Sequence, residues 1–251
     1  MSRDMTTDIH TPVITELDSR VDSVPRLVFA AALKYGNLAA IEDGDVNISY
    51  QDLPNESLAV SRALIATGIK PGDRVAIWGS NSAHWILAAI GLQMAGAILV
   101  PINTRMKAIE AAEIIKRSGA KLVFSVGDFL KSDYPANLIK LFEPSQLNII
   151  ALTNRQGAPL ASCCDWSTFI ARKNQVSEQS ARDLAMSING EYLSDLMFTS
   201  GTTGKPKGVM SRHGGMIRAF SIYVTTLGIV PGDRYLVVNP FFHSFGYKAG
   251  W

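Results

Sequence analysis

Short apolar runs alternate with amphipathic stretches along most of the chain, and this alternation constrains the fold more than any other feature. Four apolar runs rich in β-branched residues are predicted to be buried strands: 75–78, 97–100, 122–126 and 147–152. Helical periodicity precedes or separates them, and the predicted helix 107–118 ends at Gly119. Strands that alternate with helices are typical of an α/β fold. We therefore predict layered, mostly parallel sheets flanked by helices.

The alternation weakens after residue 153 and returns near residue 193. Residues 173–182 are polar, and we expect them to form a surface connection. A strand at 193–198 and a helix at about 215–227 follow, and His213 is expected to help start that helix. The chain is thus divided into three parts: a polar N-terminal tail (1–24), a first α/β subdomain (25–189) and the start of a second subdomain (190–251).

Composition and charge exclude several classes of protein. Charged residues make up only 18% of the chain, which excludes disorder for most of it. The formal net charge is only +2, so we expect no nucleic-acid partner. The most apolar stretch, residues 85–100, is interrupted by glycines and is shorter than the ~20 residues of a membrane-spanning helix. The N-terminus lacks the apolar core of a secretory signal, and the adjacent Cys163 and Cys164 are expected to be reduced. We therefore predict a cytoplasmic protein without a transmembrane segment.

One heptapeptide occurs twice. Gly-Ile-Lys-Pro-Gly-Asp-Arg at residues 68–74, the first connector, returns as Gly-Ile-Val-Pro-Gly-Asp-Arg at residues 228–234, the second connector. Proline fixes φ and glycine tolerates positive φ, which suits a turn between a helix and a strand. The flanking sequences do not repeat, so we interpret the pair as one turn used twice and not as a domain duplication.

The most unusual segment is Thr-Ser-Gly-Thr-Thr-Gly-Lys-Pro-Lys-Gly at residues 199–208, which lies between two apolar runs. Glycines allow backbone N–H groups to approach a ligand, and consecutive N–H groups form an anion-binding nest. Hydroxyl groups and a lysine add further donors. We predict a polyphosphate-binding loop made of these residues: Thr199, Ser200, Gly201, Thr202, Thr203, Gly204 and Lys207.

Other glycine-rich motifs fit this loop less well. Gly201 and Gly204 are only three residues apart and Pro206 follows Lys205, so the segment is not a Walker A loop. It also lacks the Gly-x-Gly-x-x-Gly pattern of dinucleotide-binding folds. A flexible linker is the remaining alternative, but a linker does not explain two lysines around a proline between apolar strands.

Residues 199–208, with Asp195-Leu196-Met197-Phe198 before them and Val209-Met210 after them, resemble the signature of the adenylate-forming enzymes. That superfamily includes acyl-CoA ligases, luciferase-like enzymes and the adenylation domains of peptide synthetases. The resemblance extends to Asn81-Ser82-x-x-Trp85, to Gly96-Ala97-x-x-Val100-Pro101-Ile102-Asn103 and to both connectors. It covers about residues 26–251 and implies the incomplete N-terminal domain of such an enzyme.

A second motif narrows the class. Asn-Pro-Phe-Phe-His-Ser-Phe-Gly at residues 239–246 is similar to a family segment whose histidine-containing form belongs to the CoA ligases and luciferases. The resemblance implies that His243 lies near the substrate carboxylate and that Phe242 and Gly246 shape the acid pocket. The neighbouring aromatic residues fit an apolar acid, either a fatty acid or a bulky, steroid-derived one. Packing of a strand end with one satisfied histidine is the alternative interpretation.

The resemblance implies a two-step reaction with ATP, Mg²⁺ and CoA, in which a small carboxylic acid becomes an acyl-AMP and then an acyl-CoA. No catalytic set is complete in these 251 residues, because the family's adenine and ribose contacts and its C-terminal domain with the adenylation lysine are expected beyond them. We expect the isolated chain to be inactive and no protein metal site. Transfer to a carrier protein, or a non-catalytic nucleotide-binding role, are the alternatives. The sequence does not indicate an oligomeric state.

Overall fold

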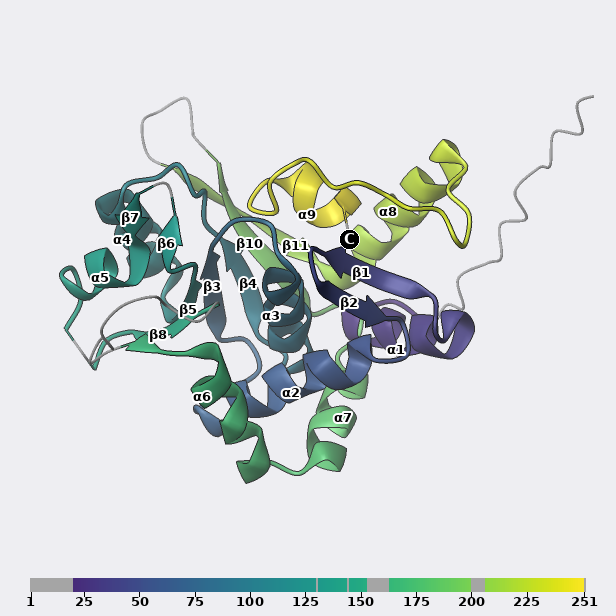
Figure 1. The fold of residues 1–251 in the computed structure, drawn as a ribbon, viewed down its shortest axis with the longest axis horizontal. Coiled ribbons are helices and arrows are strands. Elements are labelled where there is room, and N and C mark those ends of the chain that lie inside the picture. Colours follow the sequence, from purple (N-terminus) through teal and green to yellow (C-terminus); the bar gives the residue numbers. More distant parts are fainter. Residues whose placement is uncertain (1–19, 130, 144, 153–162, 200–205, 251) are drawn as a thin grey trace, which may run out of the picture.

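A seven-stranded, mostly parallel sheet forms the centre of the molecule (Figure 1). The computed structural model describes residues 20–129, 131–143, 145–152, 163–199 and 206–250. In spatial order the strands are β11 (Lys207–Arg212), β10 (Leu193–Thr199), β4 (Ile98–Pro101), β3 (Arg74–Trp78), β5 (Ala120–Ser125), β8 (Asn148–Ala151) and β9 (Cys163–Cys164). All neighbours pair in parallel except β10 and β11, which form an antiparallel hairpin. The predicted α/β class is confirmed.

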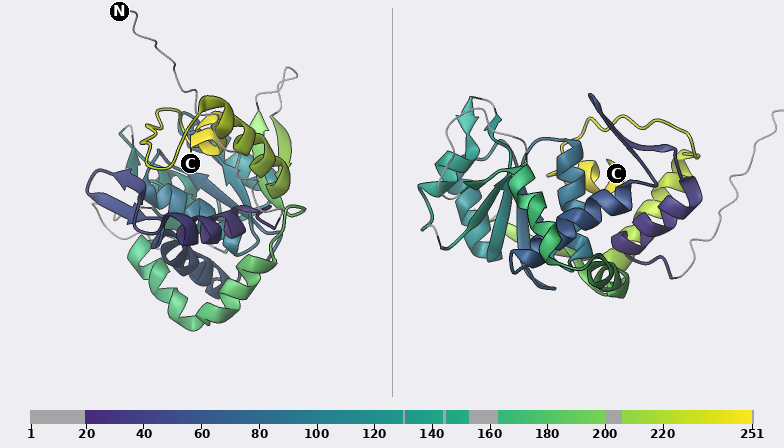
Figure 2. Two further views of the ribbon diagram at one scale, coloured as in Figure 1. Left: turned by 90° about the vertical axis from the view of Figure 1, so that its right-hand side faces the viewer. Right: turned by 60° about the horizontal axis from the view of Figure 1, so that its bottom comes forward.

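Helices cover both faces of the sheet because its central strands are apolar on both sides. One face packs against α1 (Val24–Tyr35), α2 (Leu53–Ala66), α3 (Ala83–Met94), α6 (Trp166–Ala171) and α7 (Glu178–Ser187); the opposite face packs against α4 (Ala108–Ser118) and α5 (Tyr134–Ile139). In β3 the buried Val75 and Ile77 face the first group, and Ala76 and Trp78 face the second. Figure 2 shows α1, α2 and α7 gathered on one side of the sheet.

Local sequence sets the ends of the main helices. The Ser82 hydroxyl accepts a hydrogen bond from the Trp85 N–H (3.2 Å) and so caps the start of α3. Helix α4 ends at Gly119, whose φ of 64° is left-handed, and Glu113 pairs with Arg117 along it (3.7 Å). Two short antiparallel hairpins complete this part of the chain: β1 (Ala39–Asp43) with β2 (Val46–Ser49), and β6 (Asp128–Phe129) with β7 (Ser132–Asp133).

The polar surface connection predicted for residues 173–182 is correct only in part: these residues lie at the surface except for the buried Ala181, but most of them are helical. A 3₁₀ turn (Arg172–Gln175) leads into α7, which begins after Ser177. The Ser177 hydroxyl accepts a hydrogen bond from the Ser180 N–H (3.4 Å), and the fully buried Ala181 and Ala185 face the core. Two alanines give too weak an apolar stripe to be recognised in a polar sequence, yet their small size lets α7 pack closely in the core on α2 and α3.

Helices α8 (His213–Leu227) and α9 (Ser244–Gly250) lie together on one side of the molecule, beyond the β10–β11 hairpin (Figure 1). The boundary predicted between residues 189 and 190 falls in the turn between α7 and β10, and the division into subdomains stays a prediction. Within the described parts of the chain, no helix is both long and apolar enough to span a membrane.

Candidate functional site

The β10–β11 hairpin places two predicted phosphate-loop residues opposite each other. Thr199 ends β10, Lys207 begins β11, and the two are register partners. The Thr199 hydroxyl donates to the Lys207 carbonyl oxygen (3.5 Å), and both residues are exposed. Among the described residues, no ion pair involves Lys207. The other predicted loop residues lie outside the described residues: Ser200, Gly201, Thr202, Thr203 and Gly204.

This hairpin tip follows the carboxyl end of a parallel strand, and β3 and β4 end at the same edge of the sheet. The chain leaves β3 for α3 on one face and leaves β4 for α4 on the opposite face. Adjacent strands whose connections diverge in this way form a crevice at their carboxyl ends, which is where open α/β sheets bind ligands. Thr199 and Lys207, which flank the predicted loop, therefore lie at the edge of the sheet where ligand sites are expected in this class of fold.

The segment of residues 239–246, here called the acid segment, is fixed to this edge by one side chain. The Asn81 amide nitrogen donates to the Asn239 carbonyl oxygen (2.9 Å), and the Asn81 amide oxygen accepts from the Phe241 N–H (2.8 Å). Phe241 is buried and its ring lies 5.0 Å from that of Trp85 in α3. Because Asn81 lies in the short turn after β3, the acid segment lies at the carboxyl edge of the sheet.

The three predicted pocket residues have different surroundings. His243 is exposed. Its side-chain Nδ1 accepts a hydrogen bond from the Phe245 backbone N–H (3.3 Å), and its backbone N–H donates to the Pro240 carbonyl oxygen (3.0 Å). Phe242 is half-buried. Gly246 is buried, and a Cβ atom there would lie 2.1 Å from the Pro240 carbonyl oxygen. Glycine is therefore required at position 246 by the close approach of the backbone, whereas contacts of these residues with a substrate stay a prediction.

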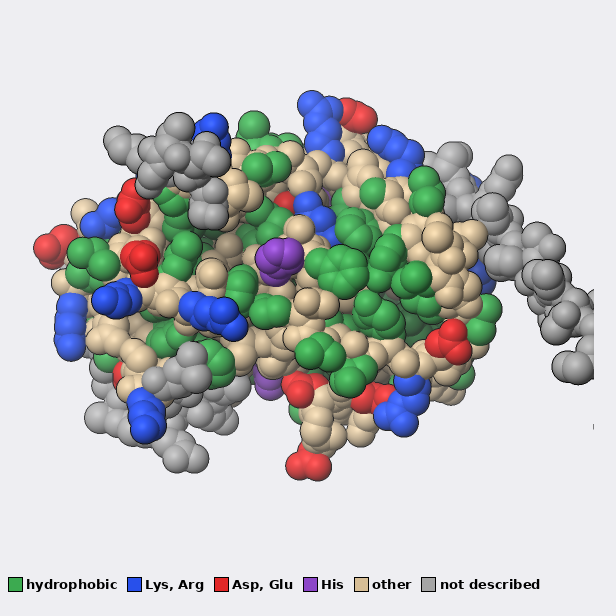
Figure 3. Space-filling model, turned by 90° about the horizontal axis from the view of Figure 1, so that it is seen from above, with side chains coloured by type: hydrophobic (Ala, Val, Ile, Leu, Met, Phe, Trp, Pro, Cys, Tyr) green, Lys and Arg blue, Asp and Glu red, His purple; other side chains and the backbone are tan. Residues whose placement is uncertain are grey.

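Aromatic and aliphatic side chains lie next to the acid segment. The ring of Phe245 is 5.8 Å from that of Tyr223 in α8, which in turn is 6.0 Å from that of Phe220. Leu236 and Val238 are also exposed just before the segment. Figure 3 shows hydrophobic side chains gathered on this side of the molecule. Such a surface suits an apolar partner or substrate better than a charged one.

Sequence reasoning missed a buried polar cluster beneath α9. Lys248 lies 3.0 Å from Asp195 of β10, and the Gln93 amide nitrogen of α3 donates to the Tyr247 hydroxyl (2.8 Å). Burial and, less strongly, the Asp195 carboxylate raise the pKa of Tyr247 well above its usual value, so its hydroxyl stays protonated. The motif that contains Asn81 is recognisable in the sequence, but its hydrogen bonds to Asn239 and Phe241 are not. Only the occurrence of Asp195 and Lys248 in otherwise apolar segments signalled this cluster.

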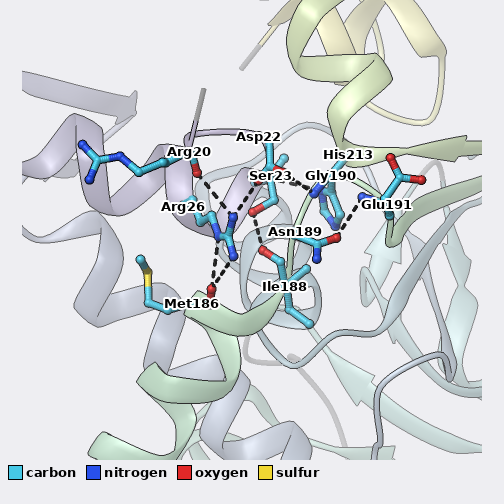
Figure 4. A network of polar contacts seen from close by, with 11 residues as sticks. Arg20, Asp22, Ser23, Arg26, Met186, Ile188, Asn189, Gly190, Glu191 and His213 are labelled. Carbon is cyan, nitrogen blue, oxygen red and sulfur yellow. Dashed lines mark hydrogen bonds and ion pairs between the residues drawn. The ribbon is translucent and has the colours of Figure 1, made fainter. Parts of the chain in front are cut away.

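His213, predicted to help start a helix, is the first residue of α8 and is buried. Its Nδ1 accepts a hydrogen bond from the Val24 N–H (3.4 Å), so it joins α8 to the start of α1. Around it the Ser23 hydroxyl donates to the Ile188 carbonyl oxygen (2.7 Å), and the Gly190 N–H donates to Asp22 (2.8 Å), as Figure 4 shows. The structural role expected for His213 is thus confirmed.

No group of three or more His, Cys, Asp or Glu side chains in the described part of the chain is arranged to hold a metal ion.

The chain matches the AMP-binding enzyme family over residues 28–251. It is 37% identical over 231 residues to a Rhodococcus jostii CoA ligase named for a propanoyl group that bears a methyl-dioxo-octahydro-indenyl ring; the match covers 91% of this chain and 45% of the relative. A Mycobacterium tuberculosis ligase of the same name is 38% identical over 82% of this chain and 39% of its own length. The chain thus spans less than half the length of these relatives.

Solved structures agree with the sequence relatives. The inhibitor-bound N-terminal domain of FACL13 from Mycobacterium tuberculosis superimposes with a TM-score of 0.72 at 27% identity, covering 90% of this chain and 53% of that domain. The fold and the family match therefore lead to one conclusion: this chain belongs to the AMP-binding enzyme family.

Proposed function

We propose that this chain supplies the phosphate loop and part of the acid-binding site of an ATP-dependent acid–CoA ligase. One observation carries the proposal: the hairpin that bears Thr199 and Lys207 and the acid segment anchored by Asn81 belong to the same carboxyl edge of the sheet. The family match and the CoA ligases among the relatives support the same kind of reaction. Because the relatives are longer, we assign the activity to the whole protein.

The proposed reaction has two steps. A carboxylate oxygen of the acid attacks the α-phosphorus of ATP, the bond to the bridging oxygen breaks, and pyrophosphate leaves with the bonding electrons. The sulfur of CoA then attacks the acyl carbon, the acyl–oxygen bond breaks, AMP leaves, and the thiol proton goes to solvent. Both steps depend on the alignment of reactants and on neutralisation of phosphate charge.

Residues 199–207 would bind the β- and γ-phosphates, which leave in the first step. The exposed Lys207 ammonium group would stabilise the charge that develops on pyrophosphate, and the hydroxyl and backbone N–H groups of the loop would hold its oxygens. Mg²⁺ bound to the nucleotide would neutralise further charge on the same oxygens. His243 would lie at the acid carboxylate, with Phe242 lining the acid pocket and Gly246 allowing its backbone to close.

The substrate that we propose is an apolar carboxylic acid, either a fatty acid or a bulky acid such as a steroid-derived propanoate. The rings of Tyr223 and Phe245 and the exposed Leu236 supply an apolar surface beside the acid segment. The names of the two relatives, which specify a fused-ring propanoyl group, support the second choice.

Product analysis with the whole protein tests the proposal. The protein is incubated with MgATP, CoA and a panel of aliphatic, aromatic and ring-bearing propanoic acids, and the products are identified by mass spectrometry. We expect an acyl-CoA with at least one bulky apolar acid and its acyl-AMP when CoA is omitted. Acyl-AMP that never transfers to CoA would favour delivery to a carrier protein. Nucleotide binding without turnover of any acid would favour a non-catalytic role.

The isolated 251-residue chain gives a second test. We propose that it lacks part of the nucleotide site and is inactive alone. Acyl-AMP or acyl-CoA formation by the purified chain would contradict this part of the proposal.

A further inference from the structure

A buried ion pair joins α9 to the two strands of the phosphate-loop hairpin. The Lys248 ammonium nitrogen lies 3.0 Å from Asp195 Oδ1 of β10 and donates to the Ser211 hydroxyl of β11 (2.6 Å). The Asp195 side chain has no exposed surface, and that of Lys248 is 13% exposed. A carboxylate so deeply buried needs a cation beside it, because an unpaired buried charge is strongly destabilising.

The strand register gives this ion pair a direct relation to the phosphate loop. Asp195 and Ser211 are partners across the hairpin, and four residues further along each strand Thr199 and Lys207 are partners at its tip. Lys248 therefore contacts the pair at the base of the same two-stranded ribbon whose other end flanks the loop. A shift of one strand relative to the other would disturb both pairs.

Helix α9 also links Lys248 to the acid segment. Helix α9 begins at Ser244, directly after His243, and the Tyr247 N–H donates to the His243 carbonyl oxygen (2.9 Å). The Tyr247 hydroxyl also accepts a hydrogen bond from the Gln93 side chain of α3 (2.8 Å). One turn of helix thus separates the ammonium group of Lys248 from the histidine of the acid segment.

We propose that Lys248 is a positioning residue that holds the acid segment in place relative to the phosphate-loop hairpin. The inference rests on the proposed function, because the two parts need a fixed relation only if a carboxylate and ATP react between them. The charge is the essential property, since it is the charge of Lys248 that keeps the buried Asp195 paired. Lys248 itself contacts no reacting atom and acts through Asp195, Ser211 and α9.

Steady-state kinetics of the whole protein separate positioning from mere stability. In Lys248→Met we expect the KM for the acid to rise at least tenfold while the KM for ATP changes less than threefold, because the hairpin stays in the sheet. Lys248→Arg keeps the charge and should keep the acid KM within threefold of the original. A purely structural role would reduce the amount of active protein and leave both KM values unchanged.

The double variant Lys248→Met/Asp195→Asn tests the proposal even if Lys248→Met alone does not fold. It removes both charges, so it should melt closer to the original protein than Lys248→Met does. Because the connection is still missing, its KM for the acid should stay at least tenfold raised. An acid KM within threefold of the original value in the folded double variant would overturn the proposal.

Hydrogen exchange of the unliganded 251-residue chain tests the connection without any reference to activity. Peptides that cover residues 239–250 should exchange at least tenfold faster in the double variant, while peptides from β3 and β5 should be unchanged. If the whole protein activates no acid but this increase is seen, the proposed function fails and the structural connection stands. Unchanged exchange in residues 239–250 would overturn the connection itself.

Discussion

The two connectors have the same turn but different surroundings. In the first, the Lys70 N–H donates to Asp73 (3.0 Å), and in the second the Val230 N–H donates to Asp233 (2.9 Å). Gly72 and Gly232 have φ values of 84° and 96°. Each connector also begins at a left-handed glycine that ends a helix or follows its last turn, Gly68 and Gly228. The same turn thus forms in both places, so the seven residues of the connector are sufficient to determine its conformation.

The residues after the two turns adopt different structures. After the first connector the chain enters β3, which lies between β4 and β5 and whose Val75 and Ile77 are completely buried. After the second connector residues 235–238 form no strand, and Leu236 and Val238 are 84% and 77% exposed. The turn is therefore a local property of the sequence, whereas the strand after it requires a sheet to join.

Truncation of one apolar residue after each connector should give the largest contrast. Ile77→Ala leaves a cavity in the core and should lower the free energy of unfolding by about 2–5 kcal/mol. Leu236→Ala removes mostly exposed surface and should change it by less than ~0.5 kcal/mol. Urea denaturation of the 251-residue chain measures both, and equal losses would show that residues 235–238 pack in a sheet of their own.

Acid should loosen the start of α8, the helix that leads to the second connector. Burial lowers the pKa of His213 to about 4, and the opposing attraction of Asp22 is smaller. In the unfolded chain His213 has its usual pKa of ~6.5 and is protonated below that pH, whereas in the folded chain it stays neutral down to about pH 4. The free energy of unfolding therefore falls between about pH 6.5 and pH 4, by up to roughly 3 kcal/mol.

The matched variant for this pH prediction is His213→Gln, which has no titratable group at this position. It should be less stable at pH 7 because the contact with Val24 is altered, but it should lose less stability between pH 6.5 and 4. Urea midpoints across this range provide the measurement. An equal slope in both proteins would contradict the assignment to His213.

The arginines that end the connectors should differ by a smaller amount. Arg74 donates to the carbonyl oxygens of Ser118 (2.7 Å) and Gly119 (3.1 Å) and so caps the end of α4. Arg234 pairs with Glu42 on the surface (2.8 Å). Arg74→Ala should cost about 2 kcal/mol and Arg234→Ala less than ~1 kcal/mol in thermal unfolding. A larger loss for Arg234→Ala would mean that the second connector is held as firmly as the first.

The smallest contrast is expected at the connector glycines themselves. Gly72 and Gly232 both have positive φ, and a Cβ atom at either would meet no atom within 4 Å. Alanine should therefore cost a similar ~1 kcal/mol at both positions, through backbone strain alone. Denaturant titration of Gly72→Ala and Gly232→Ala tests this, and a difference above ~1 kcal/mol would show that the turn depends on its surroundings.

Features with a local cause could be predicted from the sequence, and features that depend on distant neighbours could not. Ser82 and Gly119 carry their own capping chemistry, so the ends of α3 and α4 were predictable. Helix α7 was missed because two buried alanines stabilise it only in the presence of α2 and α3.

The candidate site divides in the same way. The loop motif indicated Thr199 and Lys207 because glycines, hydroxyls and lysines in one short segment have a shared chemical use. Nothing local indicated that Asn81 would hold residues 239–241, or that Asp195 would pair with Lys248 fifty-three positions later. Such contacts depend on the packed fold, in which α3, α9 and the hairpin come together.

Acid-dependent exchange of labelled pyrophosphate into ATP, measured in the whole protein without CoA, tests the central claim most directly because it isolates the first step. We predict exchange only when a suitable apolar acid is present, reduced roughly 10- to 100-fold in Lys207→Ala because a charged contact to the leaving group is lost. Exchange that needs no acid, or an unchanged rate in Lys207→Ala, would contradict the role assigned to the hairpin and the acid segment.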